Sequence, residues 1–118
     1  MPLRTLLKFF LVIFLIASLR FEQSLAETMD DLIHREGIWF KRFTDYPFTG
    51  SIFGQYQGKM VNGKMEGDWV GYYPSGQLWW KGFYKNGKEE GYHIAYFEDG
   101  KINKKHTGKY QEGIKIGE

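Results

Sequence analysis

Short apolar runs separated by turn sequences make up most of the chain after residue 36. Asn62-Gly63 and Asn86-Gly87 are typical of two-residue hairpin turns of type I′, which need positive φ at both central residues. Residues 74–76 and 98–100 lie halfway between them and predict turns of another type. The strands expected between these turns are rich in aromatic and β-branched residues and span 67–73, 77–85, 91–97 and 101–110.

Turn signals every 10–14 residues leave no room for helices between the strands. We therefore expect an all-β fold, an antiparallel meander of β-hairpins. Large rings occupy both faces of the expected strand 77–85, whereas a sheet with one wet face alternates cleanly between apolar and polar residues. The pattern favours an elongated, strongly twisted single sheet, or an incompletely closed roll, over a compact sandwich, and it predicts that rings lie over neighbouring glycines. Only residues 27–33 are expected to form a short helix.

Residues 1–26 differ in composition from the rest of the chain. A positive start at Arg4 and Lys8 precedes residues 9–17, a run with no polar side chain, and Ser24 and Ala26 suit a cleavage site after Ala26. This layout is that of a secretory signal peptide. It predicts an exported chain, periplasmic or extracellular, with an uncleaved membrane anchor as the alternative. Residues 27–35 are expected to form a lead-in to the domain that follows.

Charge and composition narrow the classes of function. Of the 16 basic and 14 acidic residues, residues 1–26 hold three and one, which leaves 13 of each in the remainder. A nucleic-acid binder draws much of its affinity from a basic surface, so no nucleic-acid partner is expected. The chain has no cysteine, so no disulfide holds it together, and its 19% aromatic content is unlike that of a disordered chain.

An internal repeat of 24 residues organises the glycines. The segment 58–81 aligns with 82–105 without a gap, and nine positions are identical, four of them glycine. A partial copy begins at Gly108 after the insertion His106-Thr107, and residues 36–57 are interpreted as a diverged first copy. We therefore expect one repeat domain over 36–118, with copies at 36–57, 58–81, 82–107 and 108–118.

The pattern N-G-K-x-E-G-x-W-x-x-Y-Y-x-x-G-Q-L, which begins at Asn62, resembles the MORN repeat family, most closely its bacterial, antitoxin-like variant. The resemblance covers residues 58–117 well and 36–57 loosely. It implies a chain of β-hairpins that serves as a scaffold for protein contacts and, in some members, for contacts with membranes or lipids. The sequence departs from the pattern at His93, which occupies the place of Trp69. A ligand groove that needed tryptophan in every copy would therefore be incomplete.

No catalytic or metal-binding constellation is visible in the sequence. His34, His93 and His106 lack metal-ligand spacing and are interpreted as surface or edge residues. Glu89 and Glu90 adjoin a predicted turn and are interpreted as solvated turn residues, although a glycosidase also needs two carboxylates. No nucleophile elbow occurs. We expect a protein that is not an enzyme and that has no cofactor and no metal site.

The aromatic residues are the only candidate site. The adjacent Trp79 and Trp80 are expected to place one indole on each face of a strand, so that at least one is exposed. Exposed aromatic patches mark binding surfaces, although the same rings also suit the core of a thin fold without a second layer. The candidate binding surface comprises Trp69, Tyr72, Trp79, Trp80 and Tyr96.

These observations favour an exported, non-enzymatic MORN-like repeat module that acts as a protein-interaction scaffold. One alternative is an antitoxin-like or immunity-like protein that neutralises a partner toxin, which the family resemblance alone suggests. Another is a module that binds the cell wall or a membrane surface. The oligomeric state is left open, because the open strand edges of a hairpin array also allow end-to-end pairing.

Overall fold

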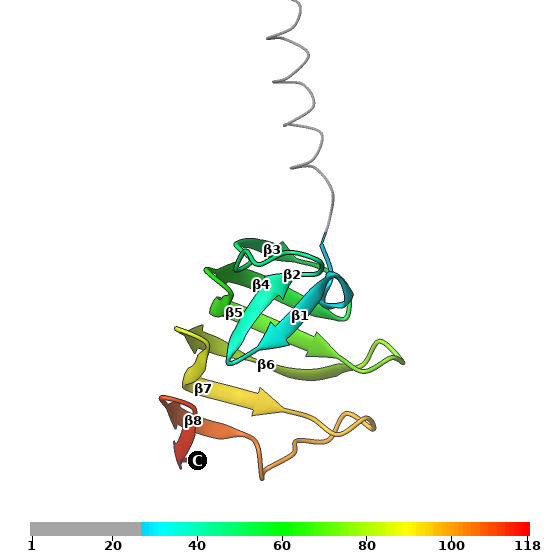
Figure 1. The fold of residues 1–118 in the computed structure, drawn as a ribbon. Coiled ribbons are helices and arrows are strands. Elements are labelled where there is room, and N and C mark those ends of the chain that lie inside the picture. The colour runs from blue at the N-terminus through cyan, green and yellow to red at the C-terminus, as the bar shows by residue number, and fades with distance from the viewer. Residues whose placement is uncertain (1–26) are drawn as a thin grey trace, which may run out of the picture.

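The computed structural model describes residues 27–118, and the predicted signal peptide with its cleavage site lies outside these residues. The described chain is almost entirely β-structure, with a single 3-10 turn, η1 (Met29–Asp31), at its start (Figure 1). The all-β prediction is therefore confirmed. The strands are β1 (Leu32–Arg35), β2 (Ile38–Lys41), β3 (Gly50–Ile52), β4 (Tyr56–Val61), β5 (Lys64–Tyr72), β6 (Leu78–Lys85), β7 (Lys88–Ala95), β8 (Gly108–Gln111) and β9 (Ile114–Gly117).

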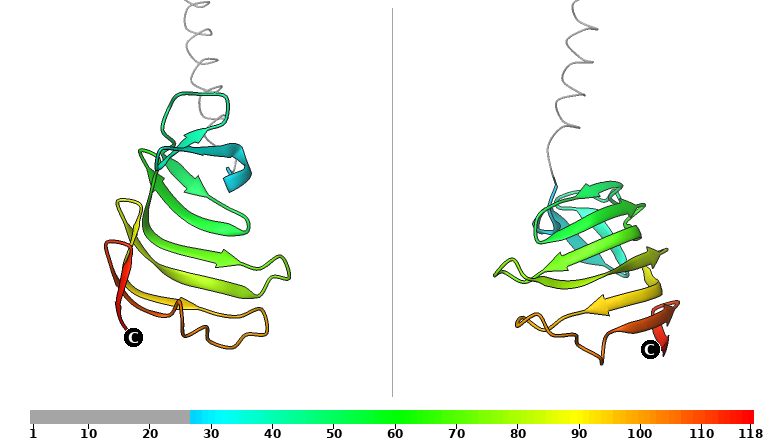
Figure 2. Two further views of the ribbon diagram at one scale, coloured as in Figure 1. Left: turned by 60° about the horizontal axis from the view of Figure 1, so that its bottom comes forward. Right: turned by 180° about the vertical axis from the view of Figure 1, so that it is seen from behind.

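Strands β3 to β9 form one open antiparallel sheet in which each strand pairs with its neighbours in the chain. The predicted meander is confirmed by this order. The sheet is curved, and the β1–β2 hairpin, a separate two-stranded sheet, lies across the β3–β5 end (Figures 1 and 2). The single sheet that we expected thus gains a second layer at one end.

The hairpin turns follow the sequence signals. Asn62-Gly63 and Asn86-Gly87 have positive φ at both residues, with φ of 50° and 76° in the first turn and 54° and 82° in the second. These values are those of the predicted type I′ turns. Two more turns, at 36–37 and 112–113, have glutamate at the first position and the same backbone signs. The other turn type closes through Gly76 and Gly100, whose amides donate to Tyr73 O and Phe97 O.

Each of the later hairpins is tied to the hairpin before it. Asn86 N donates to Glu66 Oε1 at 2.7 Å, and Glu112 N donates to Glu90 Oε2 at 3.0 Å. The repeat glutamate therefore accepts a hydrogen bond from the first turn residue of the next hairpin. Because Glu89 and Glu90 are also half-buried, their interpretation as solvated turn residues is wrong. The physical reason is that stacked hairpins place the turn of one over the strand of another.

Two elements of the structure are shorter than the sequence predicts. In residues 27–33 only η1 is helical, held by a capping box between Thr28 and Asp31, and β1 follows at once, inside the expected lead-in 27–35. The expected strand 101–110 shrinks to β8, because Asn103 starts a local turn that accepts amide hydrogen bonds from His106 and Thr107. The inserted Thr107 also bonds through its hydroxyl to both Ala95 N and Ala95 O.

The hydrophobic core lies where the hairpin covers the sheet. Leu32 of β1 packs with three buried residues of the sheet, Ile52, Met60 and Trp69. The Trp69 indole lies over Gly58 so closely that a Cβ there would overlap the ring, and its Nε1 donates to Lys59 O at 3.0 Å. The expectation that rings lie over bare glycine backbone is confirmed here.

Candidate functional site

The predicted surface residues lie in different environments. Trp69 is only 2% exposed, so its prediction as a binding residue is corrected: its ring fills the core beneath the hairpin. Tyr72, Trp79, Trp80 and Tyr96 are half-buried. Tyr96 joins Trp79 through the backbone, because Tyr96 N donates to Trp79 O at 2.7 Å. Four of the five predicted residues therefore keep some accessible surface.

The two adjacent tryptophans do not point to opposite faces. Gly71 pairs with Trp80 and Tyr72 pairs with Leu78, so Trp79 is an extra residue in β6. A β-bulge of this kind interrupts the alternation of side chains. The ring centroids of Trp79 and Trp80 lie 6.3 and 6.4 Å from that of Tyr56. The expectation of one indole on each face is therefore wrong, and the bulge is the reason.

A continuous row of rings crosses the sheet from β4 to β8. Successive centroid distances are 6.4 Å from Tyr56 to Trp80, 5.9 Å to Tyr84, 5.3 Å to His93 and 5.1 Å to Tyr110. We call these five residues the aromatic row. His93 is 6% exposed and lies over Gly82, as Trp69 lies over Gly58. Tyr84 and Tyr110 are not among the residues predicted from the sequence, although both occupy the repeat position of Met60.

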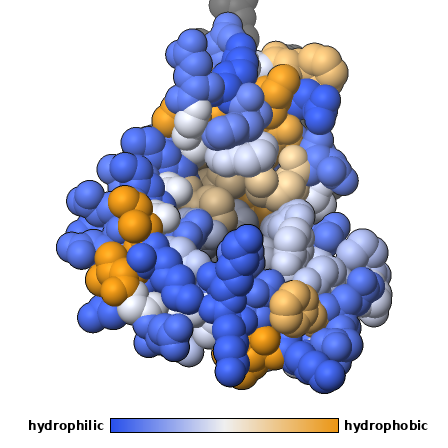
Figure 3. Space-filling view, turned by 90° about the horizontal axis from the view of Figure 1, so that it is seen from below, coloured by the Kyte–Doolittle hydropathy of each residue, from blue (hydrophilic) through white to orange (hydrophobic). Residues whose placement is uncertain are grey.

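A groove of about 370 Å³ opens along the later part of the aromatic row. Its volume lies at the small end of ligand sites, which are about 300–1,000 Å³. The view from below shows pale and orange residues in a central hollow bordered by hydrophilic residues (Figure 3). We call this cavity the aromatic groove; it is lined by Trp79, Trp80, Tyr84, Glu89, His93, Ile94, Ala95, Asn103, His106 and Tyr110.

The groove holds one carboxylate among its rings. Burial, and to a smaller extent the charge of Glu89, raise the pKa of Tyr84 above the usual range of tyrosine. The pKa of Tyr110 is raised by the same two causes in the same order. His93 Nε2 lies 2.7 Å from Phe83 O, and since a carbonyl only accepts, this nitrogen carries the proton. The His93 ring is thus held by its contact with Phe83 O, and Glu89 supplies the negative charge of the groove.

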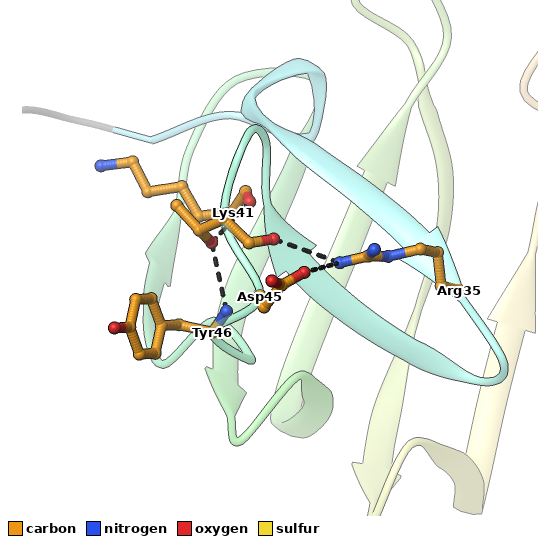
Figure 4. A network of polar contacts seen from close by, with 5 residues as sticks. Arg35, Lys41, Asp45 and Tyr46 are labelled. Atoms are coloured by element: carbon orange, nitrogen blue, oxygen red, sulfur yellow. Dashed lines mark hydrogen bonds and ion pairs between the residues drawn. The ribbon is translucent and has the colours of Figure 1, made fainter.

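A second exposed feature lies in the loop between β2 and β3. Phe43 is 97% exposed with φ of 66°, a conformation unusual for a bulky residue, and Tyr46 is 77% exposed. Arg35 fixes the loop through Thr44 O at 3.1 Å and Asp45 at 3.5 Å, while the Tyr46 ring points away (Figure 4). The only signal for this loop was the extra D-Y-P-F-T-G sequence that interrupts the diverged copy.

The opposite face of the sheet carries a second apolar patch. Phe83, Tyr92 and Ile116 are 44%, 60% and 54% exposed and border one depression. Lysines 81 and 109 line depressions on the same side. This face offers separate apolar side chains between charged ones, whereas the aromatic groove offers contiguous rings.

The chain matches no family model, no curated protein and no solved structure. The resemblance to MORN repeats therefore stays a prediction from the sequence. Within residues 27–118, no group of three or more His, Asp and Glu side chains is arranged to hold a metal ion. The same residues contain no helix of the length and apolarity needed to cross a membrane.

Proposed function

We propose that residues 27–118 form an exported, non-enzymatic interaction module that binds a partner protein in the aromatic groove. The observation that carries this proposal is the cavity itself, in which Trp79, Trp80, Tyr84 and Tyr110 stand together beside four polar residues. Tryptophan and tyrosine dominate the energetic centres of protein interfaces. A few polar groups among rings give such a site its orientation.

The position of the groove also supports binding of a chain segment. Strands β6 and β7 form its floor, and the loop 96–107 contributes Asn103 and His106 to its side. Hydrogen bonds tie this loop to the neighbouring strands, since Tyr110 Oη donates to His106 O and Ala95 N donates to Thr107 Oγ1. A site held in this way loses little conformational entropy when it binds.

Site-specific photo-crosslinking tests the proposal. A photoreactive amino acid replaces Asn103 in the groove or, as the matched control, Tyr92 on the opposite face, and crosslinking is done in the producing cells. We expect one defined protein to crosslink from position 103 but not from position 92. The additional change Trp79→Ala should reduce the yield at least tenfold. Equal products from both positions, or a yield insensitive to Trp79→Ala, would contradict the proposal.

The partner identified in this way also separates the alternatives. A crosslinked toxin that this chain inactivates would make the module an immunity-like protein, a specific form of the same function. A groove without any protein product, in a chain that sediments with peptidoglycan or vesicles, would replace the proposal by a wall-binding or membrane-surface function.

A further inference from the structure

Glu89 is a half-buried carboxylate whose side chain has no hydrogen-bond or ion-pair partner in the described part of the chain. It lies on β7 directly opposite Tyr84 and lines the aromatic groove with Tyr110. Among residues 27–118, no hydrogen bond or ion pair engages its side chain. Removing a carboxylate from water without compensation costs free energy. Such a charge at a partly desolvated position is therefore complementary to a cation supplied from outside.

The neighbouring glutamate gives the contrast within the same strand. Glu90 points away from the groove and accepts the Glu112 amide at 3.0 Å, in the same way that Glu66 accepts the Asn86 amide. The repeat thus explains Glu90 as a structural residue. It does not explain Glu89, which has no acidic counterpart one repeat earlier.

The residue one repeat earlier than Glu89 is Met65, which packs against the covered core. At this position the chain has an apolar side chain where the hairpin covers the sheet and a carboxylate where the sheet is open. A glutamate that served only to be hydrated would be surrounded by water and not by aromatic rings. Glu89 instead lies among Trp80, Tyr84 and Tyr110.

Aromatic faces and a carboxylate together form an environment for a cation. A ring attracts an ammonium or guanidinium group placed over its face, and the attraction increases when the pair is desolvated. Within residues 27–118, the lining of the groove includes no lysine or arginine that could neutralise Glu89. Of the described residues, His93 and His106 are the only basic side chains that line it, and the His93 Nε2 proton is already donated to Phe83 O.

We propose that the aromatic groove accepts a cationic side chain, the ammonium of lysine or the guanidinium of arginine, from the partner segment. The cation pairs with the Glu89 carboxylate while its methylene stem packs on the rings of Trp80 and Tyr110. This proposal rests on the proposed function, since it names the chemistry of the segment that enters the groove.

The NMR signals of the tryptophan indole N–H groups offer a direct test on the full chain. The chain has four tryptophans, of which Trp79 and Trp80 line the groove, while Trp69 is buried and Trp39 lies on the hairpin. The full chain with ¹⁵N-labelled indoles is titrated with N-acetyl-arginine methylamide and N-acetyl-lysine methylamide. The citrulline derivative serves as the neutral analogue of arginine. We expect the cations to move the Trp79 and Trp80 signals and to bind about 3–30-fold more tightly than the citrulline derivative.

Two matched variants assign the preference to Glu89. Glu89→Gln should abolish the discrimination between arginine and citrulline, whereas Glu90→Gln, with the same loss of charge and a retained acceptor for Glu112 N, should keep it. Equal binding of arginine and citrulline, or a preference that survives Glu89→Gln, would overturn the cation site. Signals that respond equally to neutral N-acetyl-leucine methylamide would also overturn it but would leave the groove as a binding site. If no compound moves Trp79 or Trp80, the cation site is wrong, and the crosslinking experiment still decides whether a protein binds.

Discussion

At the β3–β5 end of the sheet, Trp69 lies over Gly58 beneath the N-terminal hairpin. At the β6–β9 end, His93 lies over Gly82, and no hairpin formed by residues 27–118 lies above it. The two rings occupy the same repeat position and are almost equally buried, at 2% and 6% exposure. Their surroundings differ: Trp69 belongs to a closed core, and His93 belongs to the wall of an open groove.

This difference shows that the repeats form the sheet, whereas the N-terminal hairpin adds the second layer that closes a core. Stacked hairpins bury a ring over a glycine in the two full copies, but they form only one layer. A two-layer core appears only where β1 and β2 bring Leu32 onto the sheet. Where this cover ends, the same surface becomes a groove with accessible rings. The residues at one repeat position differ in the same way, because Met65 packs against the covered core and Glu89 lines the open groove.

The largest expected effect comes from removing the two equivalent rings. Trp69→Ala should lower the free energy of unfolding by about 3–5 kcal/mol, because it leaves a cavity in the closed core. His93→Ala should cost only about 1–2 kcal/mol, mainly through the lost hydrogen bond to Phe83 O, since water can enter the groove. Urea denaturation followed by far-UV circular dichroism measures both without relying on tryptophan fluorescence.

A conservative substitution at Trp69 serves as the control for the loss of the ring. Trp69→Phe retains a ring over Gly58 and should recover part of the loss, which distinguishes packing from a general effect of substitution. If Trp69→Ala and His93→Ala destabilise the chain equally, the hairpin does not make the β3–β5 end a distinct core.

A smaller effect is expected from the link between successive hairpins. Glu66→Ala removes the acceptor of the Asn86 amide and should cost about 1–2 kcal/mol in the free energy of unfolding. Glu66→Gln keeps an acceptor oxygen in the same place, and its cost should stay below about 0.5 kcal/mol. The same pair of substitutions at Glu90 tests the link to Glu112 at the open end.

Similar costs at Glu66 and Glu90 would mean that both ends of the sheet share the links between hairpins, while only the β3–β5 end has the closed core. Glu66→Gln as damaging as Glu66→Ala would mean that charge, and not the hydrogen bond, holds the hairpins together. Both variants are measured by the same urea denaturation as the ring variants.

The strand order and turns were predictable from the sequence because they depend on local signals. The Asn-Gly pairs fix positive φ at both turn residues, and glycines at a spacing of 24 fix the register of ring over backbone. The site was only partly predictable. Trp79 and Trp80 were identified from their type, but the bulge that brings both beside Tyr56 depends on how β5 and β6 pair across the sheet.

The hairpin cover was not predictable for a different reason. Nothing in residues 32–41 specifies which part of the sheet they contact, and this choice decides that Trp69 is core and that Tyr84 borders a groove. The loop that exposes Phe43 and Tyr46 was visible only as an interruption of the repeat. Long-range packing therefore separates binding residues from core residues among rings that look alike in the sequence.

The smallest expected effect concerns Tyr84, which packs against the covered core and also lines the groove. Its pKa is raised by burial first and by the Glu89 charge second, so the folded chain keeps its hydroxyl protonated at high pH. In the unfolded chain tyrosine ionises near pH 10. Above about pH 10 the unfolded state therefore binds fewer protons than the folded state, and the free energy of unfolding falls as the pH rises.

Tyr84→Phe removes this contribution, so the free energy of unfolding of the variant should decline less steeply between about pH 10 and pH 11.5 than that of the parent chain. Urea denaturation at steps from about pH 8 measures the two slopes, with the values near pH 8 as the reference for the substitution itself. Parallel declines would mean that the Tyr84 hydroxyl is as solvated in the fold as in the unfolded chain, and the open end would then begin at β6 itself.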